Sequence, residues 1–174
     1  MYFTCKITSS SETEQMRMGY MWALAFFLGF LVGPAMHHIA DVDPSILINA
    51  VAITSIMFAS FSAISLYSTR RSYLFLGGII SSLLSCMFWF RLGGYMFGYS
   101  VHGMPYLLLS LFVACMYIIY DTQMIIERSE TMNMRDVPTN TMILFLDLFD
   151  LFIKIVQLLM ELQDNDKKKK KRDD

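Results

Sequence analysis

Long apolar stretches separated by short polar connections dominate this chain. We expect five of them to be helices, at residues 18–39, 46–67, 73–90, 106–126 and 141–162. Each is close to the length of about 20 residues that an α-helix needs to cross the hydrocarbon core of a bilayer. The pattern predicts an all-α fold, a polytopic membrane helix bundle of about five hydrophobic segments. The last of these is expected to be central, because it carries charges.

Composition divides the chain into three parts. Residues 1–17 are polar and rich in Ser and Thr, which is typical of a loose segment or a short lead-in to a helix. Residues 18–162 form the predicted transmembrane helix bundle. Residues 163–174 contain a run of lysines between acidic residues and are predicted to be a disordered basic tail.

The overall balance of residues indicates an integral membrane protein in contact with a lipid bilayer. Hydrophobic residues make up 55% of the chain and charged residues only 17%. The formal net charge of −1 gives no field that would attract nucleic acid, so no nucleic-acid partner is expected. Three widely spaced cysteines without a CxxC pair predict neither a disulfide framework nor a zinc site.

Three charged residues lie in the middle of the last apolar stretch, at Asp147, Asp150 and Lys154. Each costs about 2.5–3.5 kcal/mol at the centre of a membrane helix. Their spacings of three, four and seven residues place them on one face. This stripe must therefore face other helices or a wet cavity. The order of Asp150 and Lys154 favours an ion pair within the helix, which would neutralise Asp150.

Asp121 and Asp147 are the candidate gate and ion-binding residues. Asp121 is expected at the end of the fourth stretch and Asp147 about two turns into the fifth, from the same side. Two close carboxylates in a low-dielectric site cannot both ionise comfortably, so the pair would share a proton. It would act as a proton-sensitive gate or as oxygen ligands for Ca²⁺, the candidate metal. The alternative is that neither residue has a role in gating. Asp121 would then be an interfacial carboxylate solvated at the membrane edge, and Asp147 a hydrogen-bonded residue in a contact between helices.

Basic residues, which mark the cytoplasmic side of membrane proteins, give conflicting orientations here. Arg17, Arg70, Arg71, Arg128 and Arg135 all favour a cytoplasmic amino terminus. Five complete crossings would then place the lysine-rich tail on the opposite side. Either the last stretch crosses completely and the tail is an exception, or this stretch is re-entrant and returns to the side that it entered.

Several motifs occur in an order that resembles the Bax inhibitor-1 family. They are SETEQMRMG, DPSIL, RRSYLFLGGI, YDTQ followed by IIE, and LFLDLFDLF, with a lysine-rich tail behind them. The resemblance implies a multi-pass protein of the endoplasmic reticulum membrane that has seven helices, leaks Ca²⁺ in a pH-dependent way and suppresses cell death. Its paired aspartates fall on Asp121 and Asp147. Its cytoplasmic tail falls on Lys167, Lys168, Lys169, Lys170, Lys171 and Arg172.

One departure from the family pattern leaves a second function open. Family members have two more helices before the SETEQ-like segment, and nothing here matches them. The alternative is a non-conducting, shortened form that regulates cell death by binding other proteins, with apoptosis-regulating membrane proteins as partners. The tail would then be an electrostatic handle for acidic partners or anionic lipid.

An enzyme is not expected. Tyr120-Asp121 and a second membrane aspartate superficially fit an intramembrane aspartyl protease. However, LFLD lacks the glycines that such proteases place before the second aspartate. We expect no cofactor, with Ca²⁺ and H⁺ as the transported or gating ions.

Overall fold

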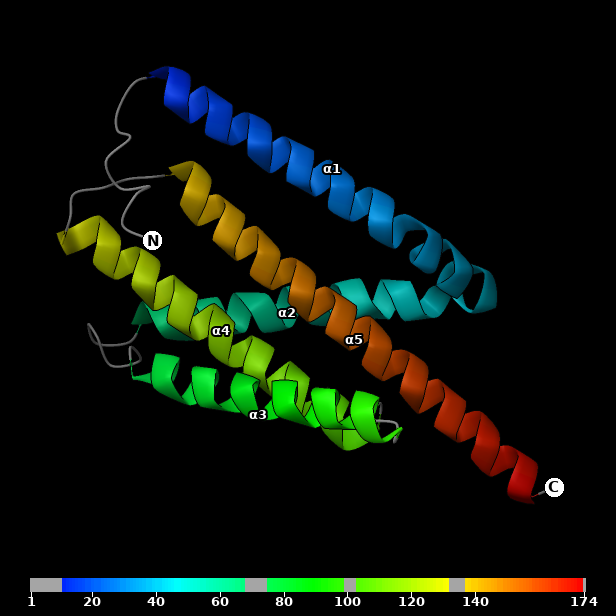
Figure 1. Cartoon of the computed structure of the whole chain (residues 1–174). Coiled ribbons are helices and arrows are strands. Elements are labelled where there is room, and N and C mark those ends of the chain that lie inside the picture. The colour runs from blue at the N-terminus through cyan, green and yellow to red at the C-terminus, as the bar shows by residue number, and fades with distance from the viewer. Residues whose placement is uncertain (1–10, 68–74, 99–102, 132–136, 174) are drawn as a thin grey trace.

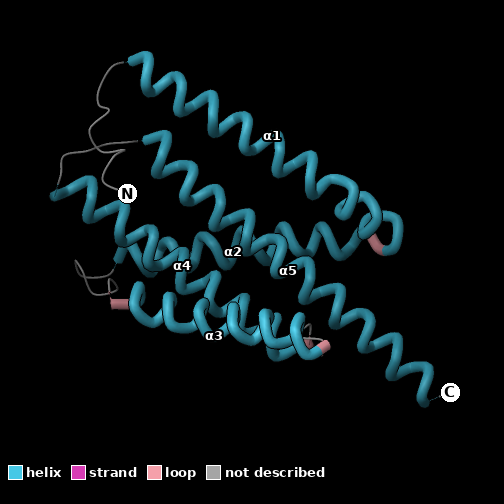
Figure 2. The backbone as a smooth tube through the Cα atoms, viewed as in Figure 1, coloured by secondary structure: helices cyan, strands magenta, loops and turns pink. Residues whose placement is uncertain are grey.

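A computed structural model describes residues 11–67, 75–98, 103–131 and 137–173 of the chain, and these residues contain only helices and the turns that join them (Figures 1 and 2). This confirms the all-α fold. The helices are α1 (Ser11–Val42), α2 (Pro44–Tyr67), α3 (Leu76–Phe97), α4 (Met104–Thr131) and α5 (Val137–Asp173).

The helices run back and forth between two ends of the bundle. One end, which we call the amino end, gathers the start of α1, the end of α2, the start of α3, the end of α4 and the start of α5 (Figure 1). The opposite end holds the α1–α2 turn, the end of α3 and the start of α4. We call it the tail end, because α5 emerges there and projects beyond the other helices.

The core lies where α2, α4 and α5 pack against one another. Its members are apolar and come from all three helices, with one contribution from the end of α1: Ile39, Ile46, Ala50, Ala114, Cys115, Ile118, Leu151, Ile155 and Val156. A smaller cluster joins α3 to α4 through Leu76, Ile80, Val113 and Met116. Thus α4 takes part in both clusters and is the helix around which the others are arranged.

The outer faces of α1, α2 and α3 are apolar and exposed. Trp22, Phe26 and Phe30 of α1 are each 70% exposed or more. In water such a surface would be unfavourable, but it suits contact with lipid chains. α1, α2, α3 and α4 are each long and apolar enough to cross a membrane.

The last helix crosses the whole bundle without a break. α5 starts at the amino end, and at the tail end Gln163 Nε2 donates a hydrogen bond of 2.7 Å to Asp43 Oδ2 in the α1–α2 turn. α5 does not turn back within the bundle, although among the described residues the helices that are long and apolar enough to cross a membrane are α1 to α4. Its three mid-helix charges distinguish it from the other four helices, and it is partly covered by α1, α2 and α4.

The α1–α2 turn is fixed by Asp43. The carboxylate Oδ1 accepts hydrogen bonds from the backbone N–H of Ser45 at 3.0 Å and from its hydroxyl at 2.6 Å, which caps the start of α2. These two bonds, followed by the Gln163 amide and the charge of Lys167, hold the pKa of Asp43 below its ordinary value. Asp43 therefore connects three helices at the tail end.

Several helices extend further than the sequence predicted. α3 continues through Gly93 and Gly94, past its predicted end at residue 90 and into the connection before residue 106, and ends at Gly98 with a left-handed φ of +73°. Burial of Gly94 explains why packing outweighs the weak helix preference of glycine. His102 of that connection lies outside the described residues. α1 likewise passes through Pro34 and turns toward α2 over its last turns (Figure 2).

The basic tail is helical rather than disordered as far as the structure describes it. α5 continues from Leu162 to Asp173, where a disordered segment was expected from residue 163 onward. Lysine is a good helix former, and Lys168 Nζ lies 2.7 Å from Asp164 Oδ2 one turn earlier. The polar amino-terminal part also begins as helix from Ser11, and residues 1–10 lie outside the described ranges.

Basic residues occur at both ends of the bundle, so the orientation conflict remains. Arg17 and Arg128 lie toward the amino end, whereas Lys167 and the lysines after it lie at the tail end. Arg70, Arg71 and Arg135 fall outside the described residues.

Gly77 permits the close approach of α3 to α4. A Cβ atom there would lie 2.9 Å from Cε2 of Tyr120, whereas one on neighbouring Gly78 would meet nothing within 4 Å. We predict that Gly77→Leu destabilises the protein by about 1–3 kcal/mol through overpacking. Gly78→Leu is the matched control and should not lower the melting temperature in detergent. Equal melting temperatures for the two variants would contradict this role of Gly77.

Candidate functional site

Asp121 of α4 and Asp147 of α5 lie at matching distances from the connection between the two helices. Because α4 and α5 are antiparallel and packed together, the two carboxyl groups face each other and are hydrogen-bonding neighbours. Each residue is partly buried. The structure thus brings the two predicted gate residues together where α4 packs against α5.

The residues around this pair define its electrostatic environment. On α4, Tyr117 lies one turn before Asp121, and its phenol is within electrostatic range of Asp121, Asp147 and Asp150. Two cations act on the pair from further away, Arg128 on Asp121 and Lys154 on Asp147. Acidic groups therefore predominate immediately around the pair.

One oxygen of the pair has no hydrogen-bond partner. Asp147 Oδ2 is shielded from solvent and makes no hydrogen bond within the described part of the chain. The hydroxyl oxygen of Thr122, next to Asp121 in sequence, is in the same situation. Because leaving such oxygens unpaired in the interior costs free energy, they are available to a proton, a water molecule or a passing cation.

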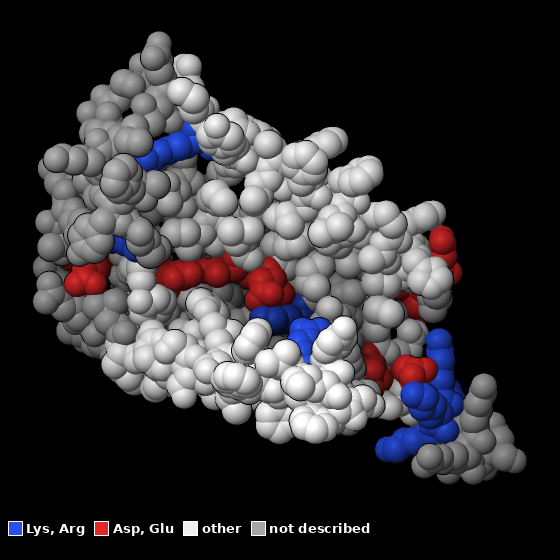
Figure 3. All heavy atoms as spheres, viewed as in Figure 1, with Lys and Arg blue, Asp and Glu red and all other residues white. Residues whose placement is uncertain are grey.

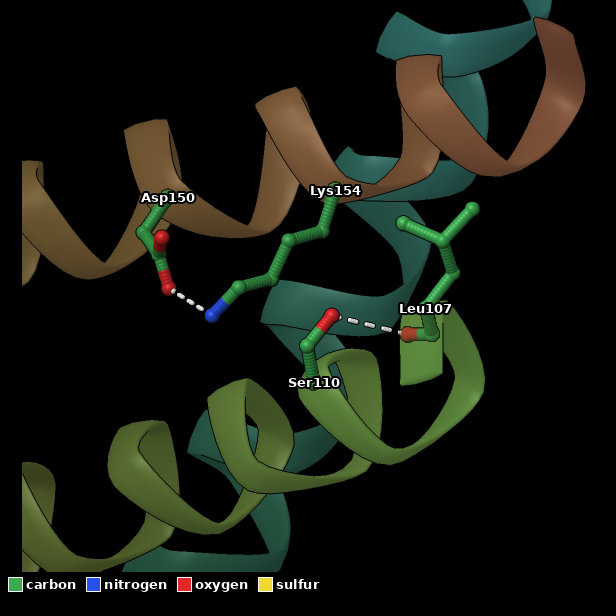
Figure 4. Close-up of polar contacts among 4 residues, drawn as sticks. All are labelled: Leu107, Ser110, Asp150 and Lys154. Carbon is green, nitrogen blue, oxygen red and sulfur yellow. Dashed lines mark hydrogen bonds and ion pairs between the residues drawn. The ribbon is translucent and has the colours of Figure 1, made fainter. Parts of the chain in front are cut away.

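The supporting ion pair forms within α5 as its spacing predicts. Lys154 Nζ donates to Asp150 Oδ2 at 2.5 Å, and Figure 4 shows the lysine side chain extending back along the helix toward that carboxylate. The lysine side chain is 20% exposed and the aspartate side chain 54%. On α4 opposite, the Ser110 hydroxyl donates to the Leu107 carbonyl at 2.8 Å.

A polar clamp joins α2 to α4 close to the carboxylate pair in sequence. The Gln123 side-chain amide donates to the backbone carbonyl of Ser65, and the Ser65 hydroxyl donates to the backbone carbonyl of Ile119 at 2.9 Å. Both side chains are buried. Buried hydrogen bonds between helices fix their relative position, so this clamp orients the segment of α4 that carries Asp121.

The carboxylate pair is not part of a larger cluster of metal-ligating side chains within the described residues. Ca²⁺ takes about six to eight oxygen ligands. The described ranges contain no group of three or more His, Cys, Asp or Glu side chains that would hold a metal. Asp121 and Asp147 therefore offer two carboxylates that would contact a hydrated cation, not a closed binding site.

The predicted tail residues lie far along α5, away from the carboxylate pair. Lys167, Lys168, Lys169 and Lys170 are exposed on the helix that projects from the tail end. Asp164 and Lys168 form an exposed ion pair, which lowers the pKa of the carboxyl and raises that of the ammonium. The side chains of Lys171 and Arg172 lie outside the described residues.

Sequence reasoning missed three residues near the pair: Tyr117, Gln123 and Gly77. A signal for Tyr117 was present, because it precedes Asp121 by one helical turn and so shares its face. Gln123 and Gly77 contact other helices, and their roles depend on interhelical positions that spacing along one helix does not give.

Comparison with known proteins agrees with the resemblance. The family model described as inhibitor of apoptosis-promoting Bax1 matches residues 1–165. The chain is 40% identical over 163 residues to Bax inhibitor 1 of Homo sapiens, covering 94% of this chain and 68% of that protein. It is 41% identical over 163 residues to Bax inhibitor 1 of Rattus norvegicus, with the same two coverages. A plant relative, Bax inhibitor 1 of Oryza sativa subsp. japonica, is 33% identical over 160 residues, covering 91% of this chain and 64% of the relative.

The polar clamp between α2 and α4 predicts a difference between two serines of α2. Ser65→Ala removes a buried interhelical hydrogen bond and should cost about 0.5–1.5 kcal/mol of stability. Ser60→Ala is the matched control, because the exposed Ser60 hydroxyl donates only to the Ile56 carbonyl of its own helix. Thermal unfolding in detergent measures both variants. Equal losses would show that the clamp does not join the helices.

Proposed function

The chain belongs to the Bax inhibitor-1 family, and from this we propose that it regulates cell death through a pH-sensitive Ca²⁺ leak gated by Asp121 and Asp147. At the coarser level it is a multi-pass membrane protein and a membrane regulator of cell death. The leak, its pH dependence and an endoplasmic-reticulum location are the finer parts of this proposal.

The observation that carries the proposal is the facing pair of carboxyl groups in the middle of the bundle. Two carboxyl groups that are hydrogen-bonding neighbours exchange protons as a pair, so the charge of this site depends on pH. When the pair shares one proton, a hydrogen bond joins the carboxyl groups of Asp121 and Asp147 and holds α4 against α5. With both carboxylates ionised, their repulsion weakens this contact and offers negative charge to a cation.

The oxygen of Asp147 without a hydrogen-bond partner supports a site through which Ca²⁺ passes rather than one that retains Ca²⁺. An ion that is to move on must be bound weakly and by few groups. Two carboxylates, assisted by water, meet this condition, whereas a closed set of ligands would retain Ca²⁺. Arg128 and Lys154 lie near enough to limit how strongly the pair attracts a cation.

We regard this protein as a regulator rather than an enzyme. The names of its relatives describe inhibition of a cell-death protein and no reaction. Aspartic proteases also contain a pair of carboxylates, but the residues around Asp121 and Asp147 do not indicate a class of substrate. The helices of this membrane protein contact the lipid bilayer.

A second candidate function rests on the exposed lysines of α5. In this alternative the chain does not conduct ions and acts by binding apoptosis-regulating membrane proteins or anionic surfaces through residues 167–172. Four of these lysines are exposed beyond the bundle, where acidic partners have free access. The two functions are distinguished by which part of α5 each requires.

The gate proposal predicts that Asp147→Asn abolishes the pH dependence of Ca²⁺ release. In vesicles that contain the purified chain and entrapped Ca²⁺, the wild-type rate should vary between about pH 5 and pH 8 as the pair exchanges its shared proton. The variant keeps the shape of the side chain without a titrating carboxyl, so its profile should be flat. Asp166→Asn removes an exposed carboxylate of the tail and is the matched control. An unchanged profile in Asp147→Asn would overturn the gate.

The binding alternative predicts the opposite pattern for the tail. Removal of residues 167–172 should abolish protection of cells against a cell-death stimulus, because the exposed positive charges are lost, while any vesicle leak persists. Replacement of the same lysines by arginine keeps the charge and should retain protection. If protection survives the deletion and disappears in Asp147→Asn, the leak is the mechanism instead.

A further inference from the structure

A second polar region lies away from the carboxylate pair, in a groove at the tail-end half of the bundle. α3 and α5 both pack against α4 but make no substantial contact with each other, so α4 forms the floor between them. The groove encloses about 730 Å³, which is within the size range of ligand pockets. Figure 3 shows acidic and basic side chains following one another along this face, between surfaces formed by uncharged residues and histidine, drawn white.

Five charged side chains line the groove, Arg91 of α3 and Asp150, Lys154, Glu161 and Asp164 of α5. Asp150 and Lys154 pair with each other toward the middle of α5, whereas Glu161 and Asp164 lie nearer the tail end. Arg91 lies in the tail-end part of α3. Lys154 and Glu161 are seven residues apart on α5, or about 10 Å along the axis. The Lys154 ammonium, however, points back to Asp150, one turn further from Glu161.

The walls of the groove are apolar. Leu84 and Met87 come from α3, Leu107 from α4, and Ile153 and Met160 from α5. Arg91 is held at the edge by its position over the ring of Tyr106, 5.7 Å from the ring centre. An occupant of this groove must therefore have an apolar part, an anionic group next to it, and a cationic group nearest the tail end.

We propose that this groove binds one zwitterionic glycerophospholipid. Its acyl chain would lie along the apolar walls, its phosphate would contact Arg91, and its ammonium would contact Glu161 and Asp164. This order matches the lipid, because the phosphate joins the glycerol and the ammonium lies beyond it. An anionic lipid without the ammonium would leave Glu161 and Asp164 unfavourably close to its negative charge. The groove also opens to the membrane, since its sides are the exposed faces of a spanning bundle.

Native mass spectrometry of the purified chain tests this with two lipids in competition, phosphatidylethanolamine and phosphatidylglycerol. The wild type should retain the zwitterionic lipid preferentially. Glu161→Gln should lower the ratio of bound zwitterionic to anionic lipid by about two- to five-fold, the size of one exposed ion pair. Arg91→Gln should lower retention of both lipids. Lys170→Gln, outside the groove, is the charge-removal control and should change neither result.

A blocking variant keeps the test independent of the charged residues. Gln157 lines the groove and is exposed, so Gln157→Trp should fill the groove without disturbing the core and prevent retention of either lipid. Retention by this variant would overturn the proposal. So would a wild type that prefers phosphatidylglycerol, or a spectrum in which a second copy of the chain replaces the lipid. None of these measurements depends on Ca²⁺ release.

Discussion

The cost of placing charge in hydrocarbon governs the arrangement of this protein. α5 carries Asp147, Asp150 and Lys154 in the part of the helix that packs within the bundle. Such a helix is unfavourable in lipid unless neighbouring helices or water face its charges. α4 supplies Asp121 and α5 itself supplies the Asp150–Lys154 pair, while α1 and α2 cover other parts of the helix. The packing of α1, α2 and α4 against α5 follows from this one requirement.

The same requirement separates the two polar regions of the molecule. Near the carboxylate pair, acidic groups outnumber nearby cations, which suits a site that holds protons and attracts cations. In the groove over α4, the charges of Arg91 and Lys154 are balanced by acidic groups, and apolar side chains enclose them. The first region requires contact between two helices, whereas the second exists because α3 and α5 stay apart.

Residue types and spacings predicted those features that depend on one helix at a time. Asp150 and Lys154 are one turn apart on one helix, so their ion pair needed no tertiary information. The approach of Asp121 to Asp147 followed from two antiparallel neighbours joined by a short connection. The contacts of Gln123 with Ser65 and of Gly77 with Tyr120 were not predicted, because they depend on the relative rotation and height of packed helices. The end of α3 was misjudged because burial of Gly94 outweighs the weak helix preference of glycine. The end of α5 was misjudged because the charge of the lysine run was weighted above the good helix preference of lysine.

The unbroken course of α5 has a mechanical consequence. Its backbone hydrogen bonds continue from Val137 to Asp173, so the helix behaves as a stiff rod. A force on the lysines outside the bundle is transmitted along this rod, and an axial shift there displaces the carboxyl of Asp147 by a similar amount relative to Asp121. The bond between Gln163 and Asp43 is the point at which such sliding is resisted. Surface charge at one end of the molecule and proton sharing at its centre are therefore mechanically coupled.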